Sequence, residues 1–280
     1  MRCYLCGSCD FTPRKGVVRD NPALHVLECN SCGLVQLDSS AHIQPGHYES
    51  SNMHPDESLE RWIAGTAPDD DRRYAALEES LAGKRVLDFG SGTGEFLRRA
   101  ARVAASVAGV EPERRAHQLY RDGIQLFPSL EAIPATAAFD VITAFHVLEH
   151  LADPREALKS LAAYLNPGGR LIVEVPSASD ALLTLYDSDA FSRFTYWSAH
   201  LFLFTPETIR RVIEQAGLRA AAIEQVQRYP LSNHLYWLSH QKPGGHERWG
   251  FLDSPALHAA YTAALAAAGK CDTLVAHIER

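Results

Sequence analysis

A glycine-rich run is the first feature of this sequence whose residue types and spacing could do chemistry. It spans residues 90–94, and Asp88 lies just before it. Glycines let the backbone approach a ligand at points where a side chain would block it. A dinucleotide-binding loop has the spacing Gly-x-Gly-x-x-Gly and receives a pyrophosphate, whereas this run has the spacing Gly-x-Gly-x-Gly. Asp88 would repel a pyrophosphate and attract a cationic ligand.

A second carboxylate, Glu111, follows the glycine run after about 20 residues. It comes at the end of a short apolar stretch that we expect to form the next strand. A carboxylate in this position can accept hydrogen bonds from both hydroxyls of a ribose. Asp88 and Glu111 therefore predict a site for a ligand that carries a ribose and a positive charge.

These side chains need a sheet to position them, and the pattern from residue 84 onward predicts one. Short apolar runs alternate with stretches of helical periodicity, which indicates crossover connections and a mostly parallel sheet. The expected strands are 85–89, 106–110, 124–127, 139–144, 170–175, one that follows Gly217 and ends near Val226, and 273–278. The expected helices are 95–105, 112–122, 154–165, 206–216 and 255–268.

The ordered motifs in this region resemble those of the class I S-adenosylmethionine-dependent methyltransferases. Their first motif is matched by Asp88 and the run 90–94, and their second acidic position is matched by Glu111. Their fourth strand is similar to residues 139–150, and the turn before their fifth strand is similar to residues 166–171. The resemblance implies a Rossmann-like α/β fold, with a seven-stranded, mostly parallel sheet and helices on both faces. It also implies S-adenosylmethionine as the cofactor.

The resemblance further implies which residues bind the cofactor. The amino-acid part would lie against Asp88 and the glycine run, and the ribose would lie against Glu111. The adenine would lie between Ser129 and Leu130, although many relatives carry an aspartate where this chain has Ser129. The implied cofactor-binding residues are Asp88, Gly90, Ser91, Gly92, Gly94, Glu111, Ser129, Leu130, Phe145 and His146.

The segment that begins at His146 has a second interpretation. His146, Glu149 and His150 match the pattern His-x-x-Glu-His, which occurs in zinc proteases. The segment directly follows a buried strand of the expected parallel sheet, and this context favours a loop beside the cofactor. Glu149 and His150 would then either brace that loop or act directly in catalysis.

Cysteines near the N-terminus predict a separate metal site. Cys3 and Cys6 form one Cys-x-x-Cys pair, Cys29 and Cys32 form another, and a glycine follows each pair. This pattern is typical of a four-thiolate zinc ribbon. Four protein ligands leave no open position on the ion, so we expect structural Zn²⁺. Cys6 and Cys9 are an alternative first pair, but no glycine follows Cys9.

A zinc ribbon ahead of such a domain resembles two groups of methyltransferases. One group acts on sugars, often nucleotide-linked, in natural-product and surface-glycan pathways. Its ribbon contains the motif Cys-x-x-Cys-Gly-Leu-Val, which residues 29–35 match here. The other group methylates bases of ribosomal RNA and has a different Cys/His spacing. The net charge of −7 and the lack of a basic cluster in the ribbon favour the first group and argue against a nucleic-acid partner.

Histidines and aromatic residues after the expected fifth strand predict where the methyl acceptor binds. In relatives, a histidine placed as His200 is here lies near the acceptor pocket. Histidine can remove a proton at neutral pH, so His200 and His146 are the candidate bases, with Tyr196 as a positioning group. The segment 229–270 is an insertion of the kind that shapes the substrate pocket, and Asn233, Trp237 and Lys242 could bind a polar acceptor there.

The sequence thus predicts three regions and one activity. A zinc ribbon would span residues 1–40, a connector with a helix 41–80, and a methyltransferase domain 81–280. The expected activity is methyl transfer to a small polar acceptor, a sugar or a sugar-derived metabolite. The alternatives are an RNA base methyltransferase and a non-catalytic S-adenosylmethionine-binding module. No apolar run is long enough to span a membrane and no secretory signal is visible, so we expect a cytoplasmic protein without a membrane partner.

Overall fold

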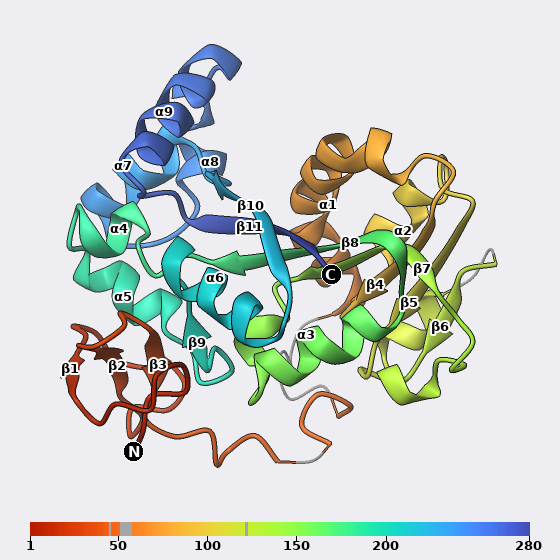
Figure 1. Ribbon diagram of the computed structural model, residues 1–280. Helices are drawn as coiled ribbons and strands as arrows, with labels where there is room; N and C mark the ends of the chain where they lie inside the picture. Colours follow the sequence, from red (N-terminus) through yellow and green to blue (C-terminus); the bar gives the residue numbers. More distant parts are fainter. Residues whose placement is uncertain (45, 51–57, 121–122) are drawn as a thin grey trace.

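The larger sheet has the seven strands that the sequence predicted. The computed structural model describes residues 1–44, 46–50, 58–120 and 123–280. In this sheet the strand order is β10-β11-β8-β7-β4-β5-β6 (Figure 1). Strands β4 to β8 pair in parallel, and β11 runs antiparallel to both of its neighbours. The strands are β4 (Arg85–Phe89), β5 (Ser106–Val110), β6 (Gln125–Phe127), β7 (Phe139–Phe145), β8 (Leu165–Pro176), β10 (Arg219–Val226) and β11 (Thr273–Glu279).

Helices cover both faces of this sheet, because neighbouring residues along its strands point to opposite sides. Val86 packs into one apolar cluster with α1 (Leu59–Leu81) and α2 (Glu95–Ala100). Leu87, the next residue, packs into the other cluster with α3 (Pro154–Ala163) and α6 (Pro206–Gln215). The expected α/β architecture with helices on both faces is confirmed. Helix α1 belongs to this packed unit rather than leading into it, because Leu77 and Leu81 are part of its core.

One expected helix is largely missing among the described residues. Residues 112–120 contain only the 3-10 turn η1 (Ala116–Leu119), and residues 121–122 lie outside the described part of the chain. Hydrogen bonds to Glu111 explain the irregular backbone here. The ring Nε2 of His117 lies 2.7 Å from the Glu111 carbonyl oxygen, and the Glu113 N–H donates to the Glu111 carboxylate at 2.8 Å.

The N-terminal module forms a second sheet that includes a strand from the larger domain. Its order is β1-β2-β3-β9, and Figure 1 shows the module beside β9. Val35 of β3 pairs with Leu203 of β9. Buried ribbon residues such as Val18 and Leu34 belong to the same core cluster as Leu87. The strands are β1 (Phe11–Pro13), β2 (Val26–Cys29), β3 (Val35–Leu37) and β9 (Phe202–Leu203).

The segment between β10 and β11 packs against the region after β8, at the upper left of Figure 1. The Trp237 ring contacts the rings of Phe191 and Phe194, with centroids 5.2 and 5.1 Å away. No helix among the described residues has both the length and the apolar character needed to cross a bilayer. The helices of this region are α4 (Ala181–Thr184), α5 (Asp189–Thr195), α7 (Leu231–His240), α8 (Gly245–Arg248), η4 (Gly250–Leu252) and α9 (Pro255–Ala267).

Candidate functional site: a cleft at the carboxyl ends of the parallel strands

A cavity of about 840 Å³ lies at the carboxyl ends of β4, β5 and β7. This edge is where open parallel sheets bind ligands. It brings together most of the cofactor-binding residues that the resemblance implied. His200, which we predicted as a candidate base, lies in the same lining. The predicted residues in its lining are Asp88, Gly90, Ser91, Gly92, Glu111, Ser129, Leu130, Phe145, His146 and His200.

The glycine loop is enclosed on two sides, which explains its residue type. Gly90 and Gly92 have φ values of 75° and 53°, a region that favours glycine. A Cβ at Gly90 would clash with the Val147 side chain, and a Cβ at Gly92 would lie 3.3 Å from the Trp62 ring. Gly94 does not line the cavity among the described residues. It caps α2 in the left-handed conformation, with φ 77°.

Two buried carboxylates face the cavity from the ends of β4 and β5. The Thr143 hydroxyl donates to Asp88 at 2.7 Å, and the Gly92 N–H donates to Glu111 at 2.7 Å. Burial raises the pKa of Asp88 to about 7 and that of Glu111 to about 6. Both groups therefore change charge close to neutral pH, where a bound cation or hydroxyl donor would favour their ionised forms.

His146 is held in a strained conformation between two buried carboxylates. Its φ is 54°, which is uncommon for a residue other than glycine. Its Nδ1 lies 3.0 Å from Glu149, and its Nε2 lies 3.2 Å from Glu174. Burial alone would lower the pKa of His146, but the hydrogen bonds to Glu149 and Glu174 raise it. Both ring nitrogens therefore already have carboxylate partners, and these hydrogen bonds favour the protonated form of the ring.

Helix α1 supplies lining residues that we did not predict. Trp62, Thr66, Asp69 and Arg73 all reach the cavity. Their spacing of four, three and four residues places them on one helical face. This spacing is the signal that could have identified them, but we interpreted the region as a connector and a helix outside the site.

Ion pairs fix α1 to the sheet beneath the cavity. The Arg73 guanidinium lies 2.7 Å from Glu174, and Arg72 lies 2.8 Å from the same carboxylate. Arg228 pairs with Asp69 through two of its nitrogens. The cations Arg73 and Arg228, which both line the cavity, are therefore already neutralised by carboxylates.

The other end of the cavity is lined by His200 and by aromatic side chains. Tyr48, Trp197, His150 and Leu151 also lie there. Burial lowers the pKa of His200 to about 3, so its ring is neutral at physiological pH. Its Nδ1 is buried and accepts no hydrogen bond from the described residues. Glu149 also has a buried carboxylate oxygen that no described residue contacts by a hydrogen bond, and a nitrogen of His200 lies within 4.8 Å of this carboxylate.

Other residues predicted for the acceptor lie elsewhere. Tyr196 is buried against the ribbon, where a Cβ on Gly16 would lie 2.8 Å from its ring. Asn233 and Trp237 are buried within the insertion, and the described lining of the cavity includes neither of them nor Lys242. The structure does not bring these residues to the cleft, and we propose no acceptor contact for them.

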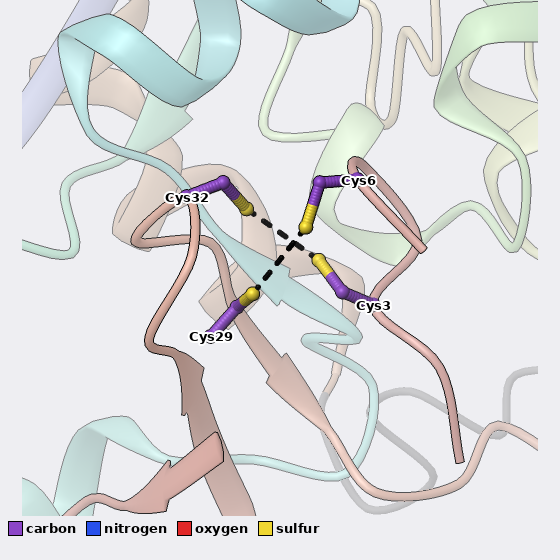
Figure 2. A group of neighbouring side chains, drawn as sticks. All are labelled: Cys3, Cys6, Cys29 and Cys32. Atoms are coloured by element: carbon purple, nitrogen blue, oxygen red, sulfur yellow. Dashed lines mark hydrogen bonds between the residues drawn. The ribbon is translucent and has the colours of Figure 1, made fainter. Parts of the chain in front are cut away.

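The predicted zinc ligands converge from two loops of the ribbon (Figure 2). The sulfurs of Cys3 and Cys32 are 3.5 Å apart, as are those of Cys6 and Cys29, and all four lie within 4.8 Å of one another. A tetrahedral zinc with Zn–S bonds of about 2.3 Å needs sulfurs roughly 3.8 Å apart, so the donor set fits such an ion. Cys9 is exposed and lies outside this group.

The sheet, the glycine loop and the two carboxylates define an S-adenosylmethionine-dependent methyltransferase. Residues 59–223 match the family described as methyltransferase domain, and the chain belongs to this family. The family match begins at the first residue of α1.

Two relatives agree with this assignment, and a solved structure shares the fold. The chain is 26% identical over 216 residues to a ubiquinone biosynthesis O-methyltransferase from Xanthomonas euvesicatoria, covering 67% of this chain and 90% of the relative. It is 29% identical over 194 residues to the Ralstonia nicotianae enzyme of the same name, covering 64% and 76%. A methyltransferase structure from Archaeoglobus fulgidus, 17% identical with a TM-score of 0.51, shares the fold over 80% of this chain and 100% of its own.

Proposed function

We propose that the protein transfers a methyl group from S-adenosylmethionine to a hydroxyl group of a small molecule that carries an aromatic ring. The observation that carries this proposal is the neutral, half-buried ring of His200, which lines the cavity and whose Nδ1 has no hydrogen-bond partner among the described residues. A neutral imidazole can accept the proton that a hydroxyl loses when its oxygen attacks the methyl carbon. Glu149 lies close enough to stabilise the imidazolium that results.

Two further observations favour His200 over His146 as the base. Both ring nitrogens of His146 are engaged by Glu149 and Glu174, and these hydrogen bonds raise its pKa. Its engaged nitrogens and its fixed orientation suit a group that positions neighbours rather than one that accepts a proton. In this proposal His146 holds the cofactor loop in place and His200 acts on the acceptor.

The lining of the cavity favours an aromatic acceptor over the sugar that the sequence predicted. Tyr48, Trp62 and Trp197 offer flat apolar faces on which a ring can stack. A nucleotide-linked sugar needs a cation for its diphosphate, but Arg73 and Arg228 are paired with carboxylates. The relatives named as O-methyltransferases support oxygen as the acceptor atom.

Labelled S-adenosylmethionine would test this proposal. The purified protein would be incubated with catechols and other phenols, with nucleotide-linked sugars, and with total RNA in separate reactions. We expect label in a phenol. Label in sugars alone would overturn the choice of acceptor class, and label in RNA alone would overturn the small-molecule proposal. Binding of S-adenosylhomocysteine without transfer in any reaction would favour the non-catalytic alternative.

We infer that the four-cysteine group of the ribbon holds one structural Zn²⁺. The inference rests on the sulfur spacing, since Cys3, Cys6, Cys29 and Cys32 can all contact one tetrahedral ion. Such a metal folds and rigidifies a small module that has little core of its own. All four ligand positions come from the protein, so the ion takes no part in the methyl transfer.

A further inference from the structure

We propose that Asp20, in the ribbon, is a positioning residue for the acceptor side of the cavity. It would act through residues 196–201, called here the acceptor loop, which carry Trp197 and His200. This inference rests on the proposed function, because that function places the methyl acceptor beside His200.

The acceptor loop has little internal structure to hold it. Helix α5 ends before it and β9 begins after it. The hydrogen bond from the His200 N–H to the Trp197 carbonyl, at 3.0 Å, is a contact between loop residues. The orientation of Trp197 and His200 must therefore be fixed largely by groups outside the loop.

Asp20 contacts the loop from outside through both oxygens of its carboxylate. One carboxylate oxygen accepts from the Ser198 N–H at 2.9 Å, and the other accepts from the Ser198 hydroxyl at 2.6 Å. Charge-assisted hydrogen bonds of this kind are stronger than neutral ones. Burial alone would raise the pKa of Asp20, but the bonds from Ser198 lower it, so the carboxylate is ionised at neutral pH. Ser198 directly follows Trp197 and lies two residues before His200, so Asp20 binds the loop at its centre.

Other ribbon groups act in the same direction. The Arg19 N–H donates to the Tyr196 carbonyl at 2.9 Å, and the Arg19 guanidinium lies 5.0 Å from the centre of the Trp197 ring. The Leu37 N–H donates to the Leu201 carbonyl at 3.0 Å. The ribbon therefore contacts the loop at both ends as well as at its centre.

The opposite side of the loop contacts the segment after β7. The Leu201 N–H donates to the Glu149 carbonyl at 2.8 Å, and His150 Nδ1 lies 2.8 Å from the Ala199 carbonyl oxygen. The loop is thus fixed between the ribbon and the segment that carries His146. The His42 ring also lies 2.7 Å from the Ser198 carbonyl oxygen. Releasing the ribbon side would therefore loosen Trp197 and His200 while leaving the cofactor residues of β4 and β5 in place.

The substitution Asp20→Asn tests this role, and Asp38→Asn is its matched control. Both carboxylate oxygens of Asp38 also contact a single residue, His25. One accepts a hydrogen bond from the His25 N–H and the other contacts the His25 ring, but this pair lies within the ribbon. Backbone hydrogen exchange of residues 196–201 would be compared with S-adenosylhomocysteine affinity and with the kinetics of methyl transfer to a catechol. The variant Ser198→Ala and the double variant would complete a double-mutant cycle.

For Asp20→Asn we expect exchange in the acceptor loop to rise about tenfold and the KM for the catechol to rise five- to tenfold. The affinity for S-adenosylhomocysteine should stay within twofold, and adding Ser198→Ala should have little further effect. The inference is overturned if Asp20→Asn matches Asp38→Asn in both exchange and KM. Faster loop exchange in a protein that methylates no acceptor would support the inference while contradicting the proposed function.

Discussion

Asp88 and Glu111 are buried carboxylates whose pKa values lie near neutral pH. A carboxylate that is half protonated before its ligand arrives must lose a proton when the ligand binds. The folded-state values, about 7 and about 6, exceed the ordinary values of 3.8 and 4.5. These two groups therefore stabilise the fold most at low pH and lose that contribution as the pH rises through 6 and 7. The affinity for the cofactor has the opposite pH dependence, because it rises as these two groups ionise.

The first prediction follows from these two groups. The affinity for S-adenosylhomocysteine should be highest above pH 7 and should fall as the pH drops through about 7 and then about 6, because ionised carboxylates attract the cationic amino group and accept hydrogen bonds from the ribose more strongly than protonated ones do. Each group contributes up to about a tenfold loss per pH unit. Calorimetric titrations from pH 5.5 to 8 would measure this. Asp88→Asn should remove the upper transition, and a flat profile in the unmodified protein would contradict the prediction.

The second prediction concerns His200. His200→Gln keeps a polar side chain of similar size but cannot take the acceptor proton, so kcat should fall by about 10²-fold or more. The affinity for S-adenosylhomocysteine should not change. His277→Gln, on β11 and paired with Glu224, is the control and should keep full activity. A kcat for His200→Gln within threefold of the control would exclude His200 as the base.

At the residue scale, the sequence predicted the cofactor side of the cavity better than the acceptor side. Asp88 and Glu111 follow predicted strands, and strand ends of a parallel sheet share one edge, so their proximity could be inferred. The difference between His146 and His200 could not be inferred. It depends on Glu174 and on the burial of each ring, and neither is visible in the local sequence.

At the scale of elements, α1 and β8 are joined by one buried carboxylate. Glu174 accepts from Arg72, Arg73 and His146, which lie on α1 and after β7. Burial alone would raise the pKa of Glu174, but the hydrogen bond from His146 and the charge of Arg73 hold it well below its usual range. One side chain therefore orients a helix and a loop that both line the cavity.

The third prediction tests this junction. Glu174→Gln leaves buried cations without their countercharge, so the free energy of unfolding should fall by about 3 kcal/mol or more. Glu224→Gln, at an exposed position on β10, should change it by less than about 0.5 kcal/mol. Urea denaturation would measure both variants. Equal stabilities of the two variants would show that the junction contributes nothing to the fold.

The sequence predicted α1 as a helix but not as part of the site. Its apolar residues around Leu77 gave the periodicity, whereas the lining face of Trp62, Thr66, Asp69 and Arg73 is mostly polar. A polar face normally indicates a solvent-exposed surface. The ion pairs of Arg73 with Glu174 and of Asp69 with Arg228 show that this face instead packs against the rest of the domain.

At the scale of the whole molecule, the ribbon and the methyltransferase domain share both a core and a sheet. Residues 1–40 were predicted as a separate module, because their cysteines and turns set them apart. The pairing of Val35 with Leu203 joins segments far apart in the chain, and no local sequence pattern predicts such a contact. The boundary between the two parts is therefore a packed interface.

The fourth prediction concerns the metal of the ribbon. The purified protein should contain one zinc per chain by atomic emission, and Cys32→Ser should lose it with a lower Tm and faster exchange in residues 196–203. Cys9→Ser should keep the zinc, because Cys9 lies outside the four-cysteine group. Retention of zinc in Cys32→Ser, or its loss in Cys9→Ser, would contradict the assigned ligand set.

The pairing of β3 with β9 also has a consequence for synthesis of the chain. The ribbon leaves the ribosome before β9 does, and the edge of β3 stays unpaired until residues 202–203 have been translated. An exposed strand edge can pair with other chains. A nascent ribbon is therefore incomplete, and we expect the interval before β9 emerges to be the time when the chain is most exposed to aggregation.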